Sequence, residues 1–105
     1  MYEHAIIDDL NMLDRDALMT KMTSELPYIS GSMGLTTIGI CIRTGLDEER
    51  LSLIVSGKRK MKWSEYMSLL FFFWNDKKGR GIIAEKGFFP EELKRAMAIN
   101  RNEHE

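Results

Sequence analysis

Cysteine, histidine and proline are scarce in this chain. Its 105 residues include one cysteine, two histidines and two prolines. A single cysteine cannot form an intramolecular disulfide or a cysteine-rich zinc site, and it suits a reducing compartment. The histidines lie near the two ends, at His4 and His104, and His4 has no partner at the spacing of metal ligands. We therefore expect a cytoplasmic protein that holds neither a metal nor another cofactor.

Long apolar runs are also missing. No hydrophobic stretch approaches the roughly 18 residues that cross a membrane. Acidic residues interrupt the first twenty positions, which argues against a secretory signal peptide. Charged residues make up 30% of the chain and hydrophobic residues 44%, as in soluble globular proteins. A chain of this length can bury one core, so we expect a single domain over residues 1–105 and no membrane partner.

The sequence shows no arrangement of residues that would catalyse a reaction. The acidic pairs Asp8–Asp9, Glu48–Glu49 and Glu91–Glu92 are sequence neighbours, so on helices they point to different sides. Carboxylate catalysis needs convergent groups, which usually come from separate segments. No nucleophile stands beside a base, and no small-molecule ligand is evident. We expect no catalytic residues, and hence not an enzyme.

The most informative stretch is residues 35–60, LTTIGICIRTGLDEERLSLIVSGKRK. Thr36 suits the N-cap of a first helix, residues 37–44. Gly45 follows, where the chain must turn sharply and a residue without Cβ enters the left-handed region at little cost. A second helix, residues 48–56, has an acidic first turn, as the helix dipole favours.

The two short helices must pack tightly across the glycine turn. Asp47 suits the N-cap of the second helix, and Gly57 ends it. Cys41 is small enough for the crossing, where a buried thiol is inert. The apolar residues with the spacing to fill the inside are Ile40, Leu46, Leu51 and Ile54.

This stretch resembles the helix-turn-helix of the lambda-repressor-like (Cro-type, xenobiotic-response-element) DNA-binding domains. The residues in the family's register, without a gap, are Leu35-Thr36, Thr44-Gly45-Leu46, Leu51-Ser52, Ile54 and Gly57-Lys58-Arg59. So many matches in one register are a fairly specific signal. The resemblance implies an all-α, lambda-repressor-like bundle of five to six helices, with residues 27–75 as its helix-turn-helix core.

The segments before this stretch are less typical of the family. Residues 1–26 have a helical apolar pattern and predict an N-terminal helical extension, in which Asp14 could cap a second segment. Its first stripe consists of Ile6, Leu10, Leu13 and Ala17. Pro27 suits the first turn of a helix, and residues 27–33 would be the family's first helix. Its serines and glycines lower helix propensity, so we expect this helix to be short, irregular, or replaced by the upstream helix.

The segments after it are rich in aromatic residues. Residues 62–75 predict a helix with Ser64 as N-cap that is apolar over most of its circumference, so both sides must be covered. The cover is either the C-terminal segment, residues 76–105, or a second subunit, and we expect a homodimer. Within 76–105 we expect a loop at 76–81, one or two helical turns at 82–86 ended by Gly87, and a last helix opened by Pro90.

The resemblance implies binding to the major groove of double-stranded DNA. The predicted base-reading residues are Glu48, Glu49, Arg50, Ser52 and Leu53. The predicted phosphate contacts are Thr37, Ser56, Lys58, Arg59, Lys60 and Lys62. Residues 35–62 hold six basic and three acidic side chains, whereas residues 1–34 hold two basic and six acidic ones. The implied function is a sequence-specific transcriptional regulator, a repressor of phage, plasmid or antitoxin type.

Three departures from the family keep a second hypothesis open. Thr37 stands where the family often has glutamine. Glu48 and Glu49 can accept from cytosine but repel the phosphates that flank the groove. Ile38 and Ile42 replace polar residues on the outer side of the first helix, which suggests a covered surface. The alternative is a protein-interaction module that kept the scaffold and lost groove reading.

Overall fold

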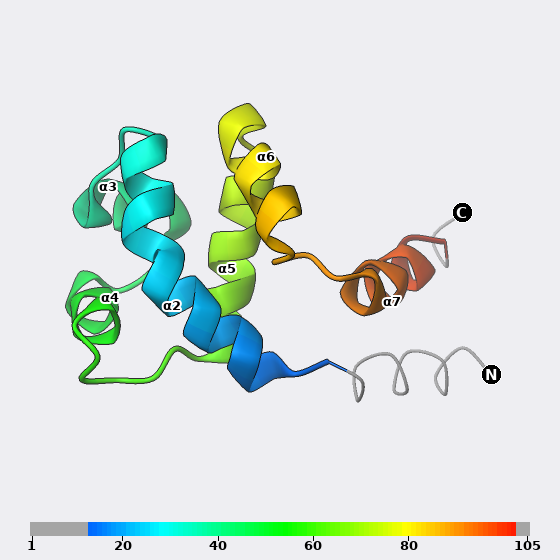
Figure 1. Ribbon diagram of the computed structural model, residues 1–105, viewed down its shortest axis with the longest axis horizontal. Coiled ribbons are helices and arrows are strands. Elements are labelled where there is room, and N and C mark those ends of the chain that lie inside the picture. Colours follow the sequence, from blue (N-terminus) through cyan, green and yellow to red (C-terminus); the bar gives the residue numbers. More distant parts are fainter. Residues whose placement is uncertain (1–12, 103–105) are drawn as a thin grey trace.

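The protein is helical throughout the part that its computed structural model describes, residues 13–102, with side chains up to Met97. The helices there are α2 (Arg15–Ser32), α3 (Thr37–Thr44), α4 (Glu48–Val55), α5 (Trp63–Trp74), α6 (Lys77–Lys86) and α7 (Glu91–Asn102) (Figure 1). No strand occurs in this range, which confirms the all-α expectation. None of the described helices is both long enough and apolar enough to cross a membrane.

The two helices predicted within residues 35–60 are confirmed. The Thr36 hydroxyl accepts a hydrogen bond from the Gly39 N–H at 3.0 Å and begins α3. Gly45 ends α3 with φ at 78°, in the left-handed region that favours glycine. The Asp47 carboxylate accepts from the Arg50 N–H at 2.8 Å and begins α4. That helix ends at Val55, one residue earlier than predicted.

Of the alternatives for residues 27–33, replacement by the upstream helix is the one found, because α2 runs unbroken through Pro27. Asp14 caps α2 as predicted, accepting from the Ala17 N–H at 2.9 Å. Pro27 removes one backbone hydrogen bond from the helix interior. Its neighbours Leu26 and Ile29 are almost fully buried, and this packing offsets the loss.

Of the stripe predicted for residues 1–26, Ile6 and Leu10 lie outside the described residues. Leu13 packs partly against the core, whereas Ala17 is exposed. The apolar face of α2 is therefore made by its later residues, including Met22, which is fully buried.

The loop expected at residues 76–81 is wrong, since α6 occupies most of it. The Asp76 carboxylate accepts from the Gly79 N–H at 2.9 Å and begins α6. Gly79 lies so close to α5 that a Cβ there would be 2.5 Å from the carbonyl oxygen of Phe73. Glycine, which lowers helix propensity, is therefore needed for the packing of α6 on α5.

Helix α5 is the centre of the core. Tyr66, Leu69, Leu70 and Phe73 are fully buried, and α2, α3 and α6 pack around them. The Tyr66 hydroxyl donates to the carbonyl of Phe88, which joins the segment before α7 to the core.

Most of the apolar surface of α5 is covered within the described part of one chain. Trp63 and Trp74 are partly buried, and Phe71 is the one large apolar side chain of α5 with substantial exposure, at 41%. The described part of the same chain covers both sides of the helix. The α5 stripe therefore gives no reason to expect a homodimer.

Candidate nucleic-acid interface

The candidate interface is built on the packing of α3 against α4. Ile40, Cys41, Leu51 and Ile54 are buried together, as expected, but Leu46 is only half-buried. Burial raises the pKa of the Cys41 thiol, and the nearby carboxylates of Glu48 and Asp47 raise it further. The thiol stays protonated at neutral pH, which agrees with a structural role.

The outward face of α4 is polar and open to solvent. Glu48, Glu49 and Ser52 are exposed, and Leu53 is half-buried. All five residues predicted to read bases are therefore accessible at least in part, since the side chain of Arg50 is 29% exposed. Exposed polar side chains on such a helix are suited to contact with base edges.

Arg50, the fifth predicted base-reading residue, is committed to another contact. Its Nε and Nη2 donate to the Glu65 carboxylate at 2.7 and 2.8 Å, and Nη2 also donates to the Lys60 carbonyl at 3.1 Å. This geometry does not support base reading by Arg50. The side chain instead ties the first turn of α4 to the first turn of α5.

Glu65 is a residue whose importance the sequence analysis missed. Hydrogen bonds from Arg50 lower the pKa of the Glu65 carboxyl, whereas its burial acts in the opposite direction and raises it. The Lys62 N–H, which donates to the carboxylate at 2.7 Å, lowers the pKa further. Lys62, not Ser64, is the N-cap of α5. A glutamate three residues after the N-cap is a known sign of a helix start, and it was present in the sequence.

The predicted phosphate-contact residues lie mostly in the basic loop, which we define as residues 56–62. Lys58, Arg59, Lys60 and Lys62 are exposed, and none forms an ion pair with another described residue. Ser56 is also exposed, while Thr37 on α3 is half-buried.

The backbone of the basic loop is held against α4. The N–H groups of Lys58 and Arg59 donate to the Leu53 carbonyl at 2.8 and 3.3 Å. The Ser56 hydroxyl donates to the same carbonyl at 3.0 Å. Together with the bond from Arg50 to Lys60, these contacts order the loop and present its cations beside α4.

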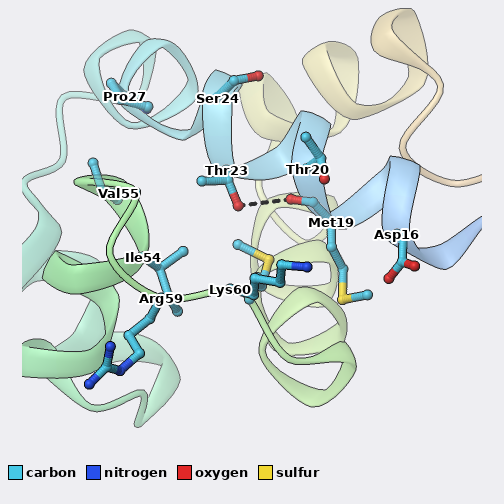
Figure 2. A pocket seen from close by; sticks show the side chains of 12 residues that line it. Asp16, Met19, Thr20, Thr23, Ser24, Pro27, Ile54, Val55, Arg59 and Lys60 are labelled. Carbon is cyan, nitrogen blue, oxygen red and sulfur yellow. Dashed lines mark hydrogen bonds between the residues drawn. The ribbon is translucent and has the colours of Figure 1, made fainter.

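The cations of the basic loop point in different directions. Figure 2 shows the Arg59 guanidinium turned away from α2, on the side of α4. The Lys60 ammonium points the other way, into a groove of about 500 Å³ between α2 and the basic loop. Arg59 is thus placed for phosphates beside α4, whereas Lys60 is not in this conformation.

The described residues contain no group of three or more histidine, cysteine or carboxylate side chains that could hold a metal ion. No family model matches the chain, and neither the curated proteins nor the solved structures include a match. The resemblance of residues 35–60 therefore rests on those residues themselves.

Proposed function

We propose that the protein is a sequence-specific, double-stranded DNA-binding transcriptional regulator with a lambda-repressor-like helix-turn-helix formed by α3 and α4. The observation that supports this most is the exposed polar side chains of α4 beside an ordered loop whose cations form no ion pair within residues 13–97. Backbone contacts that hold such a loop lower the entropy lost when its side chains meet phosphates.

In this proposal α4 enters the major groove. Glu48 and Glu49 accept hydrogen bonds from cytosine amino groups, and Ser52 contacts either kind of base pair. Leu53 offers its exposed part to a thymine methyl group. The two carboxylates reduce affinity for DNA in general, so they act through selectivity.

The basic loop supplies contacts to the DNA backbone. Lys58, Arg59 and Lys62 lie next to phosphates, which sets the register of α4 in the groove. Arg50 does not touch DNA but fixes the loop through its bond to the Lys60 carbonyl. Palindromic operators require two such units, so we propose that the protein binds DNA as a homodimer.

Selection of bound duplexes from a random pool tests this function, followed by footprinting on DNA that flanks the protein's own gene. We expect one enriched motif, with a protected segment that contains it. Recovery of unrelated sequences at every round would contradict sequence-specific binding. Sedimentation with and without the selected duplex reports the number of chains bound.

The exposed isoleucines of α3 favour the alternative, a protein-interaction module. Ile38 and Ile42 are 52% and 76% exposed, and they lie one turn apart on the same side of the helix. An apolar pair of this kind usually meets a partner. Replacement of both by serine should leave DNA binding intact under the first proposal, and should abolish partner binding under the second.

A further inference from the structure

The groove beside the basic loop combines apolar walls with polar side chains, and two of the hydrogen-bond donors among these have no partner among the described residues. Met19 and Pro27 line it from α2, and Ile54, Val55 and Met61 line the opposite side. The volume of about 500 Å³ lies within the range of small-molecule sites. Such a site cannot be inferred from the sequence, because its two sides come from segments far apart in the chain, residues 16–27 and 54–61.

The polar residues that line the groove are Asp16, Thr20, Thr23, Ser24, Arg59 and Lys60. The hydroxyls of Thr23 and Ser24 donate to backbone carbonyls of α2, whereas two other donor side chains have no such contact. The Lys60 ammonium lies inside the groove (Figure 2) and has no partner among the described residues. The Thr20 hydroxyl lines the α2 side and is likewise without a hydrogen bond there. Asp16 lies at one end of the groove, on the far side of Met19 from Ile54 and Val55.

We propose that this groove binds an amphiphilic organic anion, a molecule with an apolar body and a single carboxylate or similar acid. The body packs against the walls formed by Pro27, Ile54 and Val55, and the flexible Met19 and Met61 adapt to its shape. The acid pairs with Lys60 and accepts from Thr20. Asp16 lies beyond Met19, on the side away from the apolar body, and its charge opposes a ligand that carries more than one acidic group.

Occupation of the groove would oppose binding to DNA, and this part rests on the proposed function. A ligand that pairs with Lys60 neutralises one of the cations of the basic loop and keeps its side chain turned toward α2. The groove wall also includes Ile54 and Val55 of α4 itself. Such a ligand therefore acts on the charge and the position of the same unit that meets DNA.

Isothermal titration of the full chain with three ten-carbon probes tests the site without any DNA. We expect decanoate to bind, decanol to bind more weakly, and decyltrimethylammonium to bind weakest. Lys60→Gln should weaken decanoate about two- to fivefold, as expected for an exposed ion pair, and leave decanol unchanged. Asp16→Asn should strengthen decanoate by a similar factor.

Lys58→Gln is the matched control, since it removes the same charge outside the groove and should leave decanoate binding unchanged. Thr20→Phe should fill the groove and abolish binding of both decanoate and decanol, with circular dichroism to show that the variant is folded. The proposal is overturned if no probe binds, or if Lys60→Gln and Lys58→Gln weaken decanoate equally. If no probe binds, sedimentation of Val55→Glu shows whether the groove is instead an interface between two copies of the chain, since this variant would then dissociate a dimer.

Competition with the selected duplex then tests the regulatory part. Decanoate should weaken binding of the wild type to DNA and should have no effect on the Thr20→Phe variant. If decanoate binds but DNA affinity is unchanged, the site stands and its regulatory role is overturned. If the protein binds decanoate and no DNA at all, the proposed function fails while the site remains.

Discussion

The guanidinium of Arg50 and the carboxylate of Glu65 form a two-pronged ion pair, with N–O distances of 2.7 and 2.8 Å. The pair joins helices whose first turns are fifteen residues apart, and the basic loop lies between them. Its other donor contact reaches the Lys60 carbonyl within that loop. Arg50 therefore helps to position the proposed phosphate contacts, although its own guanidinium binds protein groups.

Replacement of Glu65 by glutamine should destabilise the protein. Arg50 would lose its ionic partner but remain partly hydrated, since its side chain is 29% exposed. We expect a loss of about 1–2 kcal/mol at neutral pH, measured by urea unfolding. The control is replacement of Glu85 by serine. Glu85 is exposed and forms no ion pair with another described residue, so this variant should have nearly unchanged stability.

The same pair predicts how stability depends on pH. The pKa of Glu65 in the folded protein lies below its ordinary value of 4.5. Its contribution is therefore complete above that value and is lost as pH falls through the lower, folded pKa. The gap in stability between the wild type and Glu65→Gln should narrow in acid. A gap that stays constant from neutral pH to about pH 3 would show that the carboxylate is not the stabilising group.

Valine at position 45 should destabilise the turn between α3 and α4. No atom lies within 4 Å of the site where its Cβ would be, so the cost comes from backbone conformation and not from a clash. With φ at 78°, a β-branched residue should cost well over 1 kcal/mol. Asparagine, which tolerates this region, should cost much less. Equal melting temperatures for the two variants would show that Gly45 does not adopt this conformation.

The two glycines within α6 should respond oppositely to alanine. Gly79→Ala places a Cβ against the backbone of Phe73, so α6 must move away from α5 and stability should fall. Gly81 has nothing within 4 Å, and alanine there should stabilise the helix by about 0.5–1 kcal/mol. Thermal unfolding of both variants measures the difference. Two stabilising substitutions would contradict the close contact between α5 and α6.

Removal of two cations from the basic loop should weaken binding to every DNA sequence alike. If Lys58 and Arg59 both contact phosphates, their replacement by alanine should lower the slope of log K against log salt by roughly two. Fluorescence anisotropy over a salt series measures this slope. Lys77 and Lys78, which are also exposed, begin α6 at the other end of α5. Their double alanine variant is the matched control and should leave the slope unchanged.

Replacement of Glu48 and Glu49 by glutamine should act on selectivity. Non-specific affinity should rise, because two charges that repel phosphates are removed. Preference for cytosine at one or two positions should weaken by roughly 1–3 kcal/mol. Competition between the selected duplex and single-base variants measures the preference. If the wild type and this variant both fail to bind DNA with any salt dependence, the protein-interaction module becomes the better hypothesis.

The features predicted correctly are those decided by near neighbours. Thr36, Gly45 and Asp47 act within three or four residues of their own positions, so their roles can be inferred from the sequence. The helical turns expected at 82–86 are the second half of α6, but a loop is predicted for its first half because Gly79 has poor helix propensity. This residue is glycine because its Cβ position lies against the backbone of Phe73 in the preceding helix. A continuous helix through Pro27 is one of several alternatives that the sequence leaves open, and the burial of its neighbours outweighs the local rule that proline disfavours a helix interior.

The candidate site was predictable to the same extent. Exposure of Glu48, Glu49 and Ser52 follows from the period of α4, and the sequence placed them on the outer face. The engagement of Arg50 depends on Glu65, fifteen residues away, and the groove depends on contact between α2 and the basic loop. Such pairings arise from tertiary packing, which the pattern of one helix does not contain.

The position of Cys41 at the crossing of α3 and α4 makes the thiol a natural probe of that crossing. Only 7% of Cys41 is exposed, so we expect a reagent to reach the sulfur mainly when the two helices separate, and it then needs the ionised form, which burial disfavours. Since the chain has no other cysteine, its rate of alkylation measures how often the interface opens, without any engineered label. While the helices stay packed, mild oxidants leave this surface unchanged.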